Sequence, residues 1–239
     1  MRINKYLAAC GLGSRRKCEE LVVAGKVFVD GKKVDALSFD VSEKAKVEVD
    51  GLLVGQKSFE YLMMFKPKGF VTTKNDDMGR KTVMDLLPEG KKHLNPVGRL
   101  DYDTEGLLLF TNDGDFANML SHPSSEIEKT YQVRVKGPIV ESELAVLRKG
   151  VVIDGKRTSP CKAKVLRTEG GKTVLELVIH EGRNREIRKM MEAIGKDVEF
   201  LKRTGYGTLS LGGLSRGKTR ELRAEEIAEL FALIGGGEV

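Results

Sequence analysis

The uneven distribution of charge along the chain is the feature that most limits how it can fold. The whole sequence of 239 residues carries a formal net charge of +6. Its first 34 residues hold eight basic and three acidic side chains, so the remainder of the chain is close to neutral. The pattern predicts a small basic module joined to a nearly neutral body, and a basic module of this kind is typical of nucleic-acid binding.

The basic segment predicts two helices followed by a hairpin. An apolar helix over residues 3–10 ends at a glycine-containing break, and Ser14 is a suitable N-cap for a second helix over 14–24. A short strand over 27–29 then meets Asp30-Gly31, a strong signal for a tight turn, before the chain returns.

Three cations occupy the first turn of the second predicted helix, namely Arg15, Arg16 and Lys17. Cations at this end of a helix oppose the helix dipole. The free N–H groups at the same end attract anions. An ordinary solvated face explains neither feature, whereas phosphate binding explains both, so we interpret this turn as an RNA contact.

Residues 2–50 resemble the small RNA-binding domain of ribosomal protein S4. The match rests on the string from Ile3 to Lys17 and on Val29-Asp30-Gly31-Lys32. The resemblance implies RNA binding but no particular reaction. The RNA-binding residues expected in this domain are Arg2, Lys5, Arg15, Arg16, Lys17 and Lys33.

The rest of the chain predicts an α+β fold. Apolar runs indicate strands over 61–65, 70–73, 107–111 and 174–179, residues 131–135 alternate as in a half-buried strand, and helical spacing appears over 187–194 and 227–234. Many strands and few helices favour a mixed, mainly antiparallel sheet with helices packed against it. The expected organisation is an RNA-binding domain over 1–50, a linker over 51–60, the main domain over 61–234 and a flexible tail over 235–239.

Several common chemistries have no support in the sequence. It has no Gly-rich phosphate loop, no dinucleotide fingerprint and no His-Glu-x-x-His zinc motif. The three cysteines lack Cys-x-x-Cys spacing, and the three histidines lie far apart. No apolar run approaches the roughly 18 residues of a membrane span, and no secretory signal is visible. We therefore expect a cytoplasmic protein without a metal, a cofactor or a membrane partner.

The densest group of polar side chains lies in the stretch from Gly98 to Gly114. A loop rich in Gly, Asp and Thr comes directly before a buried strand, where a rigid scaffold can hold side chains for catalysis. The alternative is an ordinary turn whose aspartates cap backbone N–H groups. Physical reasoning alone does not choose among Asp101, Asp103 and Asp113.

The stretch Gly98-Arg99-Leu100-Asp101-Tyr102-Asp103-Thr104-Glu105-Gly106-Leu107-Leu108 resembles a signature of the RsuA/RluB-type pseudouridine synthases. Three further motifs of that family recur in order: Lys66-Pro67 with Gly69, Lys129 with Tyr131, and Glu181-Gly182-Arg183-Asn184-Arg185-Glu186-Ile187-Arg188-Lys189-Met190. The signature aspartate of the family is catalytic, so the resemblance places that role on Asp101.

The same resemblance implies roles for other residues. Arg188 supplies the cation that pairs with Asp101, and Tyr131 stacks on the uracil, with its hydroxyl near the proton at carbon 5. Glu186 stands where the family is expected to have glutamine. The RNA-binding residues expected around this site are Arg99, Arg183 and Arg185.

The expected reaction converts a uridine of ribosomal RNA to pseudouridine. The bond from nitrogen 1 of uracil to the ribose breaks, and the base is rejoined through carbon 5, so no cofactor is needed. A carboxylate can act on the ribose as nucleophile or as base, and the sequence leaves this choice open. The segment 66–88 most resembles the large-subunit RluB branch; the alternatives are a small-subunit enzyme and a non-catalytic ribosome assembly protein. We expect a monomer that binds ribosomal RNA.

Overall fold

The computed structural model describes residues 1–55 and 58–235 and divides the chain into two compact units. The N-terminal unit comprises Met1–Phe59 with Asn112–Gly114, and the C-terminal unit comprises Glu60–Thr111 with Asp115–Val239. The two units are described separately below.

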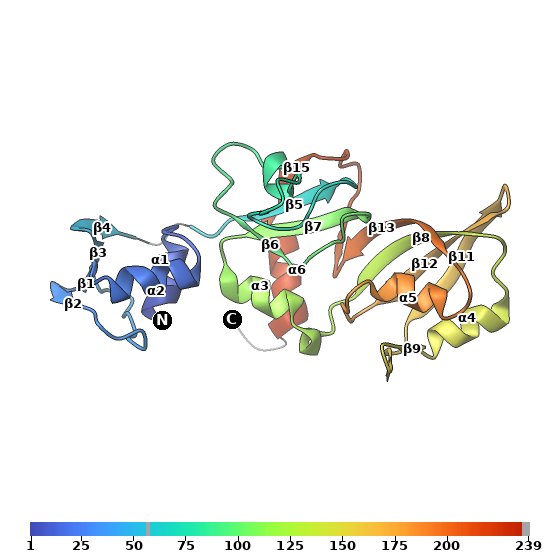
Figure 1. Ribbon diagram of the computed structural model, residues 1–239, viewed down its shortest axis with the longest axis horizontal. Helices are drawn as coiled ribbons and strands as arrows, with labels where there is room; N and C mark the ends of the chain where they lie inside the picture. The colour runs from blue at the N-terminus through green and yellow to red at the C-terminus, as the bar shows by residue number, and fades with distance from the viewer. Residues whose placement is uncertain (56–57, 236–239) are drawn as a thin grey trace. The chain divides into compact units, whose positions relative to one another are not determined.

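The N-terminal unit packs two helices on a small antiparallel sheet (Figure 1). The Ser14 hydroxyl accepts a hydrogen bond from the Lys17 N–H at 3.2 Å, which confirms the predicted N-cap. The sheet has the strand order β2-β1-β3-β4. Its elements are α1 (Ile3–Ala9), α2 (Arg15–Val23), β1 (Val27–Val29), β2 (Lys32–Lys33), β3 (Val47–Val49) and β4 (Leu52–Val54).

Strand β4 lies inside the segment expected to be a linker. Leu52–Val54 pairs antiparallel with β3, so the expectation that a linker begins at residue 51 is wrong for these residues. The turn between the two strands is Asp50-Gly51, with φ of 52° and 78°. Asp30-Gly31 has nearly the same angles, and both turns suit the right-handed twist of a hairpin. The second Asp-Gly pair thus carries the same turn signal as the first.

The C-terminal unit is built on a nine-stranded sheet. Seven strands follow the path β11-β12-β8-β13-β7-β5-β15, β14 pairs with β13, and β6 pairs with β7. Its strand pairs are antiparallel except for β7 and β13, which run parallel, so the α+β, mainly antiparallel expectation is confirmed. The strands of this unit are β5 (Tyr61–Lys66), β6 (Asn95–Val97), β7 (Glu105–Thr111), β8 (Lys129–Lys136), β9 (Val152–Ile153), β10 (Lys156–Arg157), β11 (Lys162–Glu169), β12 (Lys172–Ile179), β13 (Val198–Tyr206), β14 (Leu209–Ser210) and β15 (Thr219–Glu221).

The helices cover the two halves of this sheet differently (Figure 1). Strands β5 and β7 are buried on both faces, because α3 and α6 pack on one side and η1 on the other. Strands β8, β12 and β11 have α4 and α5 on one side only. The helices are η1 (Val83–Leu86), α3 (Gly114–Ser121), η2 (Pro123–Ser125), α4 (Glu141–Arg148), α5 (Glu186–Glu192) and α6 (Ala224–Gly235).

The alternation predicted for residues 131–135 is confirmed in β8. Tyr131, Val133 and Val135 are buried against α5 and its neighbours, whereas Arg134 and Lys136 point to the opposite face. The alternation places the odd-numbered side chains of β8 on one face of the sheet and the even-numbered ones on the other.

Residues 70–73 do not form the predicted strand. Val71 makes one isolated bridge with Thr82, and the chain then bends. Hydrogen bonds of its side chains explain why. The Thr72 hydroxyl bonds to the backbone of Leu100, and the Thr73 hydroxyl bonds to the carbonyl of Asn75, so the segment supports the loop around Leu100 and does not pair as a strand.

The predicted flexible tail over 235–239 falls mostly outside the described residues, although Gly235 is the last residue of α6. Within residues 1–55 and 58–235, no helix has the length and apolar character to cross a membrane.

Candidate active site

The loop that carries Asp101, which we call the aspartate loop, joins β6 to β7 and is fixed by hydrogen bonds from two sides. The Thr72 hydroxyl donates to the Leu100 carbonyl at 2.7 Å, and the Leu100 N–H donates back to the hydroxyl at 3.3 Å. The Thr104 N–H then donates to the Asp101 carbonyl at 3.1 Å and closes a turn. These bonds satisfy the backbone of the loop and leave the Asp101 carboxylate, about one-third exposed, to face a cavity.

Lys66 holds the same loop from beneath. Its side chain is fully buried at the end of β5, and its ammonium donates to the carbonyls of Asp101 at 2.9 Å, Thr104 at 2.8 Å and Pro67 at 3.2 Å. Burial lowers the pKa of Lys66 to about 8, and the nearby Asp101 and Asp103 carboxylates oppose that shift. Lys66 therefore fixes the backbone of the aspartate loop and places a positive charge below it.

Gly106 allows β7 and β13 to meet. Its φ is 128°, and a Cβ atom there would lie 2.2 Å from the carbonyl oxygen of Arg203. Only glycine fits both the backbone angle and this close approach. The buried Arg203 guanidinium donates to the Leu107 carbonyl at 2.7 Å, which further ties the two strands. The glycine of the signature motif thus brings the aspartate loop beside the strands that carry the rest of the site.

Tyr131 reaches the cavity from β8. It is 8% exposed and pairs in register with Arg203 of β13 on one side and Leu177 of β12 on the other. The preceding inward residue, Lys129, is also buried, and its ammonium donates to the carbonyls of Ile127 and His180, both at 3.0 Å. Burial lowers the pKa of Lys129 to about 8.

The arginine that lies near the Asp101 carboxylate is Arg185 and not the expected Arg188. Arg188, on α5, forms an ion pair with the Asp103 carboxylate at 3.0 Å and donates to the carbonyls of Asp103 at 3.3 Å and Val198 at 3.1 Å. Arg185 lies 3.9 Å from the Asp101 carboxylate and 3.3 Å from that of Asp103. The predicted pairing of Arg188 with Asp101 is therefore wrong. Arg188 lies three residues, about one helical turn, after Arg185, and at that position its guanidinium pairs with Asp103 instead.

Arg185 is held in an unusual backbone conformation by its neighbours. Its φ is 51°, in the left-handed region that non-glycine residues rarely adopt. Glu186 closes the turn around it: the Glu186 carboxylate accepts from the Arg183 N–H at 3.0 Å, and the Glu186 N–H donates to the Arg183 carbonyl at 3.2 Å. Strain of this kind persists only where surrounding contacts enforce it, and it is frequent at functional sites.

The buried Glu186 interacts with the half-buried Glu181. Burial, followed by the hydrogen bond and charge of Glu181, raises the pKa of Glu186 to about 7. The pKa of Glu181 is lowered because hydrogen bonds from Ser159 and Glu186 outweigh its own burial. The Ser159 hydroxyl donates to Glu181 at 2.5 Å, and Arg183 pairs with it at 3.0 Å. The pKa values of the two carboxyl groups are therefore shifted in opposite directions, and protonation is favoured on Glu186 over Glu181.

These side chains surround one cavity of about 650 Å³. It is a size suited to a base and its sugar, within the range of small-molecule sites. Of the predicted site residues, Asp101, Tyr131, Arg99, Arg183 and Arg185 line it, and Arg188 acts on its edge through Asp103. Lys66, Lys129 and Glu181 belong to motifs recognised in the sequence, where they were given no role, and Arg203 lies outside those motifs.

The remaining predicted RNA-binding residues belong to the N-terminal unit. Arg15, Arg16 and Lys17 are exposed on the first turn of α2, and Lys33 is exposed on β2. Arg2 is engaged within the unit: it donates to the Ser38 carbonyl and lies 3.7 Å from Asp40. Lys5 is half-buried on α1.

Metal ligands do not gather anywhere in the described part of the chain: no group of three or more His, Cys, Asp or Glu residues is placed to hold a metal ion. Cys10, Cys18 and Cys161 are free thiols.

Comparison with known proteins identifies two families along the chain. Residues 60–193 match the family described as RNA pseudouridylate synthase, and residues 1–55 match the S4 domain. These two matches correspond to the nine-stranded unit with its cavity and to the basic unit with its two helices.

Individual relatives extend over nearly the whole chain. It is 45% identical over 239 residues to the ribosomal large subunit pseudouridine synthase B of Bacillus subtilis, covering 99% of this chain and 98% of that protein. It is 41% identical to the protein of the same name from Haemophilus influenzae, covering 98% of this chain and 68% of that one. A crystal structure of a pseudouridylate synthase is similar with a TM-score of 0.70 and 28% identity, covering 96% of this chain and 99% of that one.

Proposed function

The chain belongs to the RNA pseudouridylate synthase family and carries an S4 domain, and from this premise we propose that its substrate is a uridine of large-subunit ribosomal RNA. Two relatives that it matches over 98% or more of its length carry that activity in their names. The observation that carries the proposal is the cavity of about 650 Å³ that both Asp101 and Tyr131 line. Its surroundings are basic, as an RNA substrate requires.

Asp101 is the residue we assign to the chemical step. Isomerisation of uridine conserves every atom of the base, so one carboxylate that acts on the ribose, as nucleophile or as base, is enough to begin it. Asp101 is suited to this because its backbone is fixed by Lys66 and Thr104 while its carboxylate remains accessible. Arg185, 3.9 Å away, provides the positive charge that stabilises the carboxylate when substrate excludes water.

Tyr131 is assigned to the base. It lies on the buried face of β8 and lines the same cavity as Asp101, so a uracil between them would stack on its ring. Its hydroxyl is then placed to assist the proton transfer at carbon 5. The uridine must leave its stack to enter, as for other enzymes that act on nucleobases.

Arg188 is assigned a positioning role. Its pair with the Asp103 carboxylate and its bond to the Asp103 carbonyl connect α5 to the aspartate loop. It acts on Asp101 through the loop and not by direct charge pairing.

We also propose a division of labour between the two units. The S4 domain, whose exposed cations on α2 face solvent, supplies affinity for RNA, and the unit that begins near residue 60 supplies the chemistry. The two relatives named above come from bacteria, where ribosomal RNA is made in the cytoplasm, and on that ground we place this protein in the cytoplasm.

The test of the assignment is Asp101→Asn, with Asp103→Asn as the matched control two residues along the same loop. Asp101→Asn should remove pseudouridine formation and leave RNA affinity unchanged, because it keeps the size of the side chain and removes its charge. Asp103→Asn should retain measurable turnover. Substantial turnover by Asp101→Asn would overturn the assignment.

The substrate is tested by mapping pseudouridines in cells that lack the protein. Loss of a site in large-subunit RNA supports the proposal, and loss of a site in small-subunit RNA favours the alternative branch. If no site is lost from either RNA, the proposed substrate is rejected and the alternative of a non-catalytic ribosome assembly protein is favoured.

A further inference from the structure

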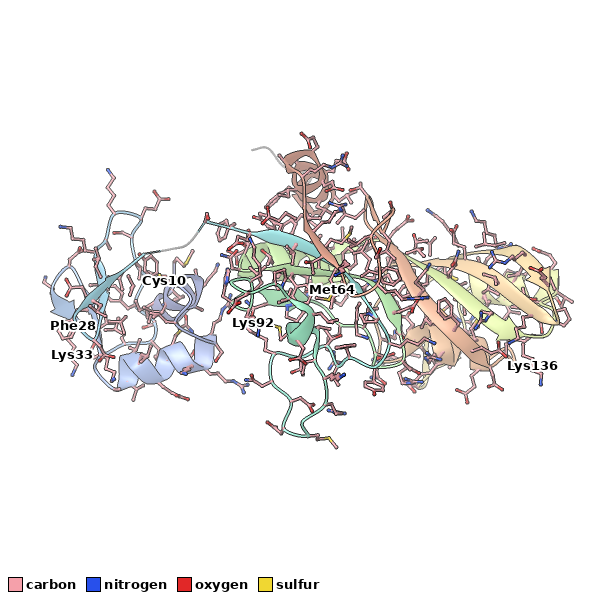
Figure 2. The ribbon with its side chains drawn as sticks, turned by 90° about the horizontal axis from the view of Figure 1, so that it is seen from above. Cys10, Phe28, Lys33, Met64, Lys92 and Lys136 are labelled. Carbon is pink, nitrogen blue, oxygen red and sulfur yellow. The ribbon has the colours of Figure 1, made fainter. Side chains whose placement is uncertain are left out.

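Within the described residues, one face of the outer half of the sheet, formed by β11, β12, β8 and the first half of β13, has no helix over it. Helices α4 and α5 cover the face that includes Tyr131 and the core, and the opposite face of β11, β12, β8 and the first half of β13 is open. Figure 2 views these strands from the open side, with Lys136 labelled at the end of β8. We call this the open face.

The strand register places basic side chains of four neighbouring strands side by side on the open face. Lys164 pairs across to Glu176 and Gln132, and Arg167 pairs across to Val174 and Arg134. In all, the face carries seven basic side chains and three acidic ones. The basic residues are Arg134, Lys136, Lys162, Lys164, Arg167, Lys172 and Lys202, and the acidic residues are Glu169, Glu176 and Glu199.

This charge is concentrated and not an average property of the protein. The open face has a net charge of +4 and the first 34 residues +5, while the whole chain has +6. The remaining surface is therefore net negative. Two separate basic regions on an otherwise acidic chain would steer a polyanion to those regions.

Four of the seven basic side chains on the open face have a carboxylate partner. Lys162 pairs with Glu128 at 2.5 Å, and Lys164 pairs with Glu176 at 2.9 Å. Lys172 and Arg134 share the single carboxylate of Glu199, at 2.8 and 3.5 Å. Lys136 lies directly opposite Lys172 across the strand pair, an arrangement of like charges that destabilises a sheet. Among the described residues, Lys136 and Lys202 form no ion pair within 4 Å.

An aromatic ring lies among these basic side chains. Phe200, on β13, is partly exposed, with the Lys68 ammonium 4.9 Å and the Arg134 guanidinium 5.3 Å from its ring centre. Cations and an aromatic ring together on a sheet face are the features with which sheets bind RNA strands, through phosphate contacts and base stacking.

Protection of the sheet edge explains only part of this charge. Lysines on an edge strand prevent association with other sheets, and β11 is the edge, so Lys162 and Lys164 fit that role. Strands β8 and β13 are interior, and edge protection gives no reason for Lys136 and Lys202.

We propose that the open face is a second RNA-binding surface of the catalytic unit, distinct from the cavity that holds the target uridine. It rests on the proposed function only in taking RNA as the partner. Its partner is a segment of the substrate RNA beyond the one in the cavity, held by its phosphates. Because the cavity lies on the opposite face of the sheet, this surface acts on affinity for extended RNA and not on the chemical step.

The test compares Lys136→Gln/Lys202→Gln with a control of equal charge, Lys92→Gln/Lys149→Gln, on exposed lysines outside the open face. Each full-length protein is measured with two RNAs: unmodified large-subunit ribosomal RNA, and a short hairpin cut around the uridine that the wild type converts. Thermal unfolding checks that both variants fold.

For the long RNA, the open-face variant should bind about tenfold more weakly near 0.1 M salt, with a log–log salt slope flatter by roughly 1.4 to 1.8. For the hairpin, its affinity and single-turnover rate should equal those of the control. Equal affinity of both variants for the long RNA overturns the proposal. Equal weakening on the hairpin also overturns it, because the surface would then belong to the cavity. A wild type that converts neither RNA rejects the proposed substrate instead, and the binding comparison with long RNA still decides the role of the face.

Discussion

The basic side chains of the S4 domain and those beneath the candidate active site are cations in opposite settings. Arg15, Arg16 and Lys17 are exposed and their charged groups face water. Lys66 and Lys129 are buried, and their ammonium groups donate to backbone carbonyls. Exposed cations remain available to phosphates and are screened by salt. Buried cations instead fix the backbone that carries the proposed catalytic residues, so the two regions should respond differently to the loss of charge.

The largest effect should come from Lys66→Met. It removes a donor to three carbonyls, of which, among the described residues, only that of Asp101 keeps another donor, the Thr104 N–H, and the loss of these bonds should destabilise the fold by about 3 kcal/mol in total. A displacement of the aspartate loop by about 1 Å should lower single-turnover activity roughly a hundredfold. Urea unfolding and single-turnover assays measure the two effects.

The control for this variant is Lys26→Met in the S4 domain. Lys26 forms an exposed ion pair with Asp50 at 3.1 Å, so its loss should change stability by less than about 1 kcal/mol. If the two variants are equally stable and equally active, the loss of a buried lysine has no larger effect than the loss of an exposed one, and the contrast between the two regions fails.

The next largest effect should distinguish Arg188 from Arg185, because their loss should change stability by different amounts. Arg188 is 15% exposed and bonds to Asp103 and Val198, so Arg188→Met should lower stability by about 2 kcal/mol and activity severely, while Arg188→Lys keeps part of both. Arg185 is 45% exposed, so Arg185→Met should leave stability within about 0.5 kcal/mol and lower turnover. Unfolding curves and turnover rates for the three variants decide this. A stable, fully active Arg188→Met would show that its link to Asp103 is unnecessary.

A smaller effect should appear in the pH profile. Glu186 has its pKa raised in the folded protein, from 4.5 to about 7, so its stabilising contribution is complete below about pH 4.5 and is lost as pH rises through about 7. Wild-type stability should fall across that window by on the order of 2 kcal/mol. Glu186→Gln keeps a neutral acceptor for the Arg183 N–H and should flatten both this decline and the matching decline in activity. Identical profiles for variant and wild type would mean that the proton of the Glu181–Glu186 pair is not lost in this range.

The smallest effect on chemistry should come from the S4 domain. Replacement of Arg15, Arg16 and Lys17 by glutamine should flatten the log–log salt dependence of RNA binding by about two to three units. At saturating RNA the single-turnover rate should remain near wild type, because Asp101 belongs to the other unit. An unchanged salt slope would mean that these cations are only solvated. A collapsed rate would mean that the S4 domain helps to shape the active complex.

Local patterns predicted much of the fold. The Ser14 cap, the Asp30-Gly31 turn and the alternation of β8 depend on neighbouring residues alone, and the structure confirms them. The Asp50-Gly51 turn carried the same signal and was missed, which shortened the first domain. Strand β11 was also missed, because it is an edge strand whose exposed residues lack the apolar alternation of a half-buried one.

The sequence by itself determined which residues gather in motifs: the aspartate loop, the Lys66 turn, Tyr131 and the arginines that begin α5. Only the tertiary structure decided which of them touch. Arg188 and Arg185 are equally plausible partners of Asp101 from their order in the chain, and the pairing depends on how α5 packs against β13. The parallel contact of β7 with β13 joins residues about a hundred positions apart, and no local pattern encodes it. The same holds for the open face, because cations on four strands form one surface only after long-range register places them side by side.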